Sequence, residues 1–179
     1  MPYRLNMSVI SPSSMTHPMR NLLFIFLVSL FVMSGMWGCT PAFVKGTDID
    51  YTPQRQEIAD FVEKYRVALE QRDFDTLKDM VSSNYYENAS TTDTPEDDYG
   101  FTGFLEWSQK MKASIKAVKY SLKLLKIEVM EKNAVVDVEI RSQYLFTYNE
   151  RDRWDTFVDK NRLTLNKDKL GHWKILSGL

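Results

Sequence analysis

The sequence of 179 residues predicts one α+β domain behind a short export signal. Two observations indicate the fold class. Apolar residues recur at helical spacing in three stretches between residues 53 and 115, and beyond Val118 they alternate with polar residues as in strands. Because the helices precede the strands, the order favours an antiparallel sheet over the strand–helix alternation of a parallel one.

The charge balance excludes one class of partner. The first 39 residues contain Arg4 and Arg20 and no acidic side chain, so the rest of the chain is slightly acidic, although the whole chain carries only −1. Nucleic acids are bound mainly through basic surfaces that neutralise their phosphates. We therefore expect no nucleic-acid partner.

The segment before Cys39 has the layout of a secretory signal peptide. Arg20 precedes an almost uninterrupted apolar run over residues 22–33. A helix that spans a membrane needs about 20 apolar residues, so this run is too short. We predict that residues 1–38 of the sequence precede the mature protein as its signal peptide. Within them, Met19 is the expected start of translation.

Cys39 is the only cysteine, which excludes an internal disulfide and a cysteine zinc site. With Gly38 before it and Met36 three positions before it, the segment resembles the lipobox of bacterial lipoproteins. The resemblance implies cleavage before Cys39, lipidation of its sulfur and anchoring on the periplasmic side of the cell envelope. Two alternatives stay open: cleavage after Ala42, which releases a secreted domain, and an uncleaved anchor. Residues 39–51 are predicted to be a lipidated tether.

Residues 52–179 are predicted to form the domain, which opens with three helices. Thr52 and Pro53 are typical of the N-cap and first position of a helix, and Asp73 is typical of a second N-cap. The apolar stripe of the first helix is Ile58, Phe61, Val62, Tyr65, Ala68 and Leu69. The stripe of the third helix is Phe104, Leu105, Ser108, Met111 and Ile115.

The residues after Val118 predict an antiparallel meander. The alternation changes phase after Leu124, which is typical of a β-bulge or a sharp bend. Three further strands are expected over residues 136–148, 154–165 and 172–176.

Three features along the chain mark a known fold. They are the long first helix, the step Arg-Asp-Phe-Asp-Thr-Leu at residues 72–77, and the closing strand His-Trp-Lys-Ile at residues 172–175. In these features the chain resembles the nuclear transport factor 2-like superfamily, which includes the ketosteroid isomerases. The resemblance implies a cone-shaped fold, with three helices packed in a strongly bent sheet around a cavity. It implies no single activity, because that superfamily hosts isomerases, dehydratases and proteins without catalysis.

Two polar residues are the weak catalytic candidates. Counting back in twos from Leu165 and Leu163 places Asn161, Asp159 and Phe157 on the core side of their strand. Burial raises the pKa of a carboxyl group, so an inward Asp159 could serve as a general base. The alternative is a second change of phase, which turns Trp154 and Val158 inward and leaves Asp159 in water.

Aromatic residues supply the candidate ligand-binding set, expected near the mouth of the cavity. Tyrosine hydroxyls around an apolar pocket suit a lipid-like or polycyclic ligand. The set is Tyr85, Tyr86, Tyr99, Phe104 and Trp107. Acidic residues 93–98 lack the ligand spacing of a calcium loop, and His172 is expected at the surface. No metal and no cofactor is expected.

These observations leave three functional hypotheses. The first is a membrane-anchored envelope lipoprotein with a non-catalytic binding domain and an apolar pocket. The second is a cofactor-independent enzyme, of the isomerase or dehydratase kind, that uses Asp159, Asn161 and a tyrosine for proton transfer on a hydrophobic small molecule. The third is a structural module that forms homodimers. A deep cavity containing Asp159 would favour the enzyme.

Overall fold

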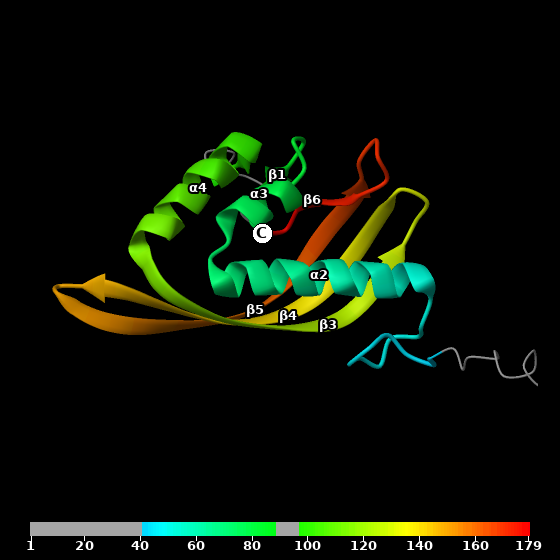
Figure 1. Ribbon diagram of the computed structural model, residues 1–179, viewed down its shortest axis with the longest axis horizontal. Helices are drawn as coiled ribbons and strands as arrows, with labels where there is room; N and C mark the ends of the chain where they lie inside the picture. Colours follow the sequence, from blue (N-terminus) through cyan, green and yellow to red (C-terminus); the bar gives the residue numbers. More distant parts are fainter. Residues whose placement is uncertain (1–40, 89–96) are drawn as a thin grey trace, which may run out of the picture. The chain divides into compact units, whose positions relative to one another are not determined.

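The computed structural model describes residues 41–88 and 97–179, and Pro41–Leu179 forms one compact unit. Three helices lie on the concave side of a curved, four-stranded antiparallel sheet (Figure 1). The helices are α2 (Pro53–Gln71), α3 (Phe74–Met80) and α4 (Phe101–Ser114). The sheet strands are β3 (Ile115–Val129), β4 (Asn133–Tyr148), β5 (Arg151–Lys167) and β6 (Trp173–Ser177). The predicted α+β class and helix-then-sheet order are confirmed.

The starts of the first two helices follow from their capping residues. The backbone N–H of Arg55 donates to Thr52 Oγ1 (3.1 Å), and that of Thr76 donates to Asp73 Oδ1 (3.0 Å). Each cap satisfies an N–H group that has no partner within its own helix. Between the helices Arg72 adopts a left-handed conformation (φ 57°), which ends α2 and turns the chain into α3.

The register of the sheet explains its curvature. The β3–β4 pairing shifts between Leu124 and Lys126, so the predicted β-bulge is confirmed. The β4–β5 pairing has no shift along its whole length, and its two-residue turn places Asn149 and Glu150 at positive φ (48° and 63°). Strand β5 therefore begins at Arg151, three residues earlier than predicted, and the β4–β5 hairpin is longer than expected.

One local prediction needs correction. Ile115 was expected at the end of the third helical stripe, but it is the first residue of β3. The polar stretch after residue 83 also contributes to a short pairing, in which β1 (Tyr86–Glu87) pairs with β2 (Tyr99–Gly100). Backbone pairing can thus form in a stretch whose side chains show no alternation.

The expected tether over residues 39–51 is wrong for the part that the structure describes. Phe43 pairs with Asp50, and the N–H of Tyr51 donates to the carbonyl of Ala42 (3.0 Å), so residues 42–51 form a small hairpin. Val44 is only 1% exposed and belongs to the core. Cys39 and the predicted signal peptide over residues 1–38 lie outside the described residues. No described helix is long and apolar enough to cross a membrane.

The core occupies one half of the long β4–β5 hairpin. We call residues 133–140 and 159–166 the proximal half, and residues 141–148 and 151–158 the distal half. Completely buried side chains of the proximal half belong to one hydrophobic cluster with residues of α2 and α3; they include Val136, Val138, Leu163 and Leu165. In the distal half Phe157 is 56% exposed and Val158 is 60% exposed. Figure 1 shows this half extending past the end of α4.

Candidate functional site

An apolar groove of about 420 Å³, here named the distal groove, lies between α4 and the distal half of the hairpin. Its walls come from one helix and three strands. The lining residues are Trp107, Met111, Ile115, Ser142, Tyr144, Phe146, Asp155 and Phe157. A concave, mainly apolar site with few polar groups is the common form of a small-molecule site.

The periodicity of each element brings these side chains to one face. Trp107 and Met111 are four residues apart on α4 and therefore project from the same side of the helix. On the sheet, alternate residues of β4 share a face with their cross-strand partners on β5. Tyr144 pairs with Asp155, and the rings of Tyr144 and Phe157 are 5.9 Å apart. The groove is thus a direct product of strand alternation continued beyond the core.

One ion pair marks the rim of the groove. Asp155 Oδ1 lies 3.3 Å from Nε of Arg153, an exposed side chain. Beside the groove, Tyr120 pairs with the buried Ser142 and stacks edge-on against Tyr65, with ring centroids 6.1 Å apart. Burial raises the pKa of Tyr120 to about 12, so its hydroxyl stays protonated. The boundary between groove and core is therefore uncharged near neutral pH, and Asp155 is the only carboxylate among the lining residues.

The predicted aromatic set comes together, but mostly as packed core. Tyr85 and Phe104 are buried with ring centroids 5.8 Å apart, and Tyr85 also contacts Tyr99 at 6.0 Å. Phe104 stacks on Trp107 (5.9 Å), which is the one member of the set that lines the distal groove. Tyr86 is exposed, and its hydroxyl bonds to Asp98.

Tyr85 helps to hold the C-terminus. Its hydroxyl donates to Glu87 Oε2 (3.2 Å), and the same carboxylate oxygen accepts the N–H of Gly178 (2.6 Å). Burial raises the pKa of Tyr85 well above its usual range, which keeps the donor protonated. Its position therefore indicates a structural role.

The alternation predicted for β5 continues without a second phase change, so Trp154 and Val158 do not turn inward. Asp159 shares the concave face with Leu163, as continued alternation predicts, yet it is exposed to water, as the alternative predicted. It lies on β5 before the first residue that pairs with β6, Thr164. Asn161 is half-buried, and its Nδ2 donates to the carbonyl of Gly178 (2.8 Å).

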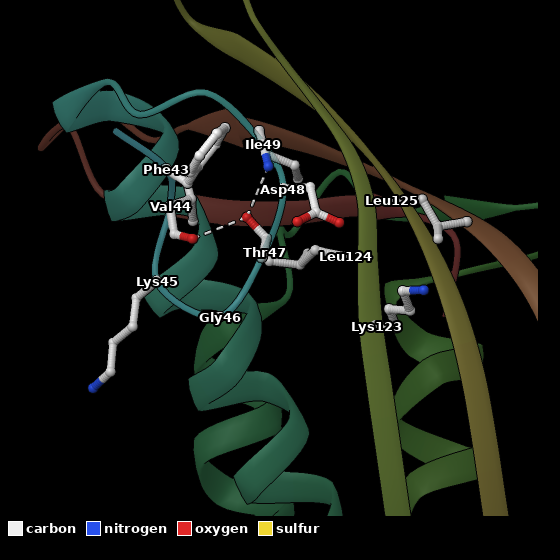
Figure 2. A pocket seen from close by; sticks show the side chains of 10 residues that line it. All are labelled: Phe43, Val44, Lys45, Gly46, Thr47, Asp48, Ile49, Lys123, Leu124 and Leu125. Atoms are coloured by element: carbon white, nitrogen blue, oxygen red, sulfur yellow. Dashed lines mark hydrogen bonds between the residues drawn. The ribbon is translucent and has the colours of Figure 1, made fainter. Parts of the chain in front are cut away.

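A second groove, of about 610 Å³, lies between the hairpin of residues 42–51 and the bulge of β3 (Figure 2). The hairpin is stiffened by Thr47, whose Oγ1 donates to the carbonyl of Val44 (3.0 Å) and accepts the N–H of Ile49 (3.1 Å). Figure 2 shows Asp48 pointing toward β3 and Lys45 pointing away from it. Charged and backbone groups line much of this N-terminal groove, so it suits an apolar ligand less well than the distal groove does.

Metal-binding groups do not converge in the part of the chain that the structure describes, where no three His, Cys, Asp or Glu side chains gather. His172 is exposed, as predicted, with Nδ1 3.6 Å from Asp168 Oδ2. Residues 93–96 of the acidic stretch lie outside the described residues.

Several groove residues were not among the sequence candidates. Met111 was predicted only as part of the third helical stripe, Phe146 only as part of the strand over residues 136–148, and Asp155 was not singled out. The sequence did indicate one thing about this site: Asp155 and Phe157 lie an even number of residues from Leu163 and therefore share its face of the strand. This indication was insufficient because the sequence does not show how far the helices cover the sheet.

Comparison with known proteins identifies the fold. No protein-family profile and no curated protein matches the sequence. Among solved structures, a conserved protein from Planctomyces limnophilus is 11% identical and aligns over 70% of this chain and 92% of its own, with a TM-score of 0.60. A protein of the nuclear transport factor 2-like family from Streptomyces avermitilis, provisionally called a dehydratase, is 13% identical over 69% and 92% of the two chains (TM-score 0.56).

A ketosteroid isomerase-like protein from Erwinia carotovora is 11% identical over 72% of this chain and 95% of its own (TM-score 0.55). At such low identity the likeness shows the fold alone. The domain therefore has the nuclear transport factor 2-like fold, as the sequence resemblance implied, and this fold leaves the activity open.

Proposed function

We propose that this protein is a lipid-anchored envelope protein whose domain binds an apolar small molecule in the distal groove without catalysis. The observation that carries the binding function is the groove itself. It exposes aromatic rings, above all Phe157, on a surface that the core does not require. Burying such a ring against a ligand removes apolar area from water, which is the main driving force for binding of this kind.

The polar groups of the groove favour binding over catalysis. A general base gains its strength from burial or from a neighbour that shifts its pKa. Asp155 lies at the rim and is paired with the guanidinium of Arg153, and Asp159 is exposed outside the groove lining. The cofactor-independent enzyme thus loses the carboxylate that the sequence hypothesis assigned to it.

Fluorescence titration with the neutral apolar probe N-phenyl-1-naphthylamine tests the binding function. We expect saturable binding, weakened by at least about tenfold in Phe157→Ala because a buried aromatic contact contributes on the order of 1.5–3 kcal/mol. The matched control is Phe43→Ala, which removes an equally exposed phenylalanine at the N-terminal groove. Equal weakening by both variants, or no saturable binding, would contradict the proposal.

The anchoring function rests on the sequence around Cys39 and on the short stretch of chain between Cys39 and the N-terminal hairpin. The first hydrogen bond of the N-terminal hairpin involves Ala42, three positions after Cys39. An extended chain spans at most about 3.6 Å per residue, so a lipid on Cys39 would hold the domain within roughly 11 Å of the bilayer surface. The exposed Phe43 lies at this end of the domain.

Metabolic labelling with an alkyne fatty acid tests the anchor. We expect the full-length protein to be labelled and to fractionate with membranes, and Cys39→Ser to lose the label and to shift toward the soluble fraction or the uncleaved precursor. Because several acyl chains are needed for stable anchoring, the loss is expected to be nearly complete. An unlabelled wild-type protein would overturn the lipoprotein assignment and leave the groove experiment unaffected.

A further inference from the structure

The outer edge of β5 is a long run of backbone without a strand beside it. Strand β6 pairs with β5 only from Thr164 to Lys167. Just before this stretch, the carbonyl of Gly178 accepts a hydrogen bond from the side-chain amide of Asn161. Among the described strands none pairs with the outer side of residues 151–160. Such an edge presents free N–H and C=O groups that can extend the sheet into another chain.

We propose that this edge pairs with β5 of a second copy of the chain, antiparallel and around a two-fold axis at Thr156. A two-fold axis perpendicular to the sheet keeps each face of the sheet on the same side. Two residues can therefore lie opposite each other only if both have odd numbers or both have even numbers. With the axis at Thr156, Arg153 faces Asp159 of the partner subunit. In the same register Asp152 faces the partner's Lys160.

Apolar side chains also match in this register. Trp154 faces Val158 of the partner subunit, and both side chains are exposed in the single chain, by 42% and 60%. Cross-strand pairs of opposite charge, and of aromatic with β-branched residues, are the pairs that stabilise antiparallel sheets. Charges on edge strands usually block unwanted pairing. Here they are self-complementary in the register centred on Thr156.

Neighbouring registers lack this match. An axis at Asp155 places the two copies of that carboxylate directly opposite each other, and an axis at Phe157 places Asp155 opposite Asp159 of the partner subunit. Like charges in opposed positions destabilise a sheet. Existing contacts leave room at Asp152, because Lys116 and Thr147 both bond to its Oδ1 and leave Oδ2 available. In the single chain Arg153 pairs with Asp155, and Asp159 Oδ1 accepts the backbone N–H of Lys160, so these two contacts are exchanged or shared when the dimer forms.

The pairing also completes the distal groove. Asp155 at the rim of the groove faces the partner's Phe157, so each copy contributes an aromatic ring to the edge of the other's groove. This inference does not depend on what the groove binds, since the edge, the charges and the register exist without a ligand.

Disulfide trapping and oligomeric state test the proposal on the fragment Pro41–Leu179. This fragment contains every described helix and strand and the whole described core, and it lacks Cys39, so an introduced cysteine is its only thiol. We expect Thr156→Cys to form a covalent dimer on oxidation, because opposed Cα atoms lie about 4.5–5.5 Å apart, within disulfide range. The control Val158→Cys stays monomeric on a non-reducing gel, because its two copies would be about 13 Å apart.

Charge reversal tests the register in sedimentation experiments. We expect the wild-type fragment to dimerise, Arg153→Asp alone and Asp159→Arg alone each to weaken the dimer at least about tenfold, and the double variant to regain most of the affinity. Both side chains are exposed, so the variants keep the fold. A wild-type fragment that stays monomeric at all concentrations, equal cross-linking at residues 156 and 158, or a double variant without recovery would each overturn the proposal.

Discussion

The two halves of the β4–β5 hairpin use the same strands and the same alternation but differ in what covers them. In the proximal half Val136 and Val138 are completely buried under α2 and α3. In the distal half Tyr144 and Phe146 occupy equivalent positions on β4, yet they line an open groove beside α4. One pleated surface therefore forms the core at one end and leaves apolar side chains exposed in a groove at the other.

The difference follows from the lengths of the elements. Helix α2 has 19 residues and lies along the proximal sheet, whereas α3 has only 7 and β6 only 5. With 16 and 17 residues, β4 and β5 extend beyond what these elements cover. Loss of stability should therefore concentrate in the proximal half, and loss of binding in the distal half.

The largest expected effect separates two valines on neighbouring strands. Val138→Ala removes two methyl groups from a completely buried site and should lower the free energy of unfolding by roughly 2–3 kcal/mol. Val158→Ala, at an exposed site, should change it by less than about 0.5 kcal/mol. Urea unfolding at low protein concentration, where self-association does not contribute, measures both. Val158 lies on the outer face of the sheet, so similar losses in the two variants would contradict the assignment of the core to the concave face of the proximal half.

A smaller effect is expected where the covered part of β5 gives way to its free edge. Gly178 has φ +96°, and a Cβ atom there would lie 2.1 Å from the carbonyl oxygen of Arg162. Gly178→Ala should therefore cost about 1–3 kcal/mol. Gly171→Ala is the control, because it has a similar φ of +86° but no atom within 4 Å. Thermal unfolding should show a larger decrease in Tm for Gly178→Ala than for Gly171→Ala. An equal decrease in both variants would mean that Gly178 is not in close contact with the backbone of β5.

The smallest expected effect concerns an ion pair on the outer face of the proximal half. Arg162 Nε lies 2.7 Å from Asp137 Oδ1, and this hydrogen bond lowers the pKa of the carboxyl group. A lowered pKa in the folded state stabilises the protein above the carboxyl's ordinary pKa, and this stabilisation is lost as the pH falls through the folded-state value. Asp137→Asn should slightly lower Tm at neutral pH and lose this effect in acid.

The matched control for this ion pair is Glu139→Gln, two residues along the same strand and on the same face. Because surface pairs contribute little, the difference between the two variants at neutral pH should be small. A Tm difference that grows as the pH falls would contradict the assignment of the Asp137 carboxylate as the stabilising form.

Local chemistry explains which parts of the fold could be predicted. Thr52 and Asp73 cap their helices through hydrogen bonds within one turn, and the phase change after Leu124 appears directly as a bulge. These signals depend on neighbours in the chain. The hairpin of residues 42–51 was missed because its main anchor, Val44, is a single apolar residue in a polar segment and gains its burial from distant elements.

The candidate site was less predictable for the same reason. Alternation correctly placed Asp159, Asn161 and Phe157 on the concave face, but parity says nothing about exposure. Phe104 and Trp107 were correctly placed near each other, yet only one reaches the groove.

The sequence by itself determined the three helices and the four strands of the curved sheet, the starts of α2 and α3 and the bulge of β3, because each depends on residues close together in the chain or on their order. The tertiary structure alone decided where the core ends, that Asp159 lies in water and that Phe157 borders a groove. Burial depends on which elements cover a strand, and that coverage is set by element lengths and packing between distant parts of the chain.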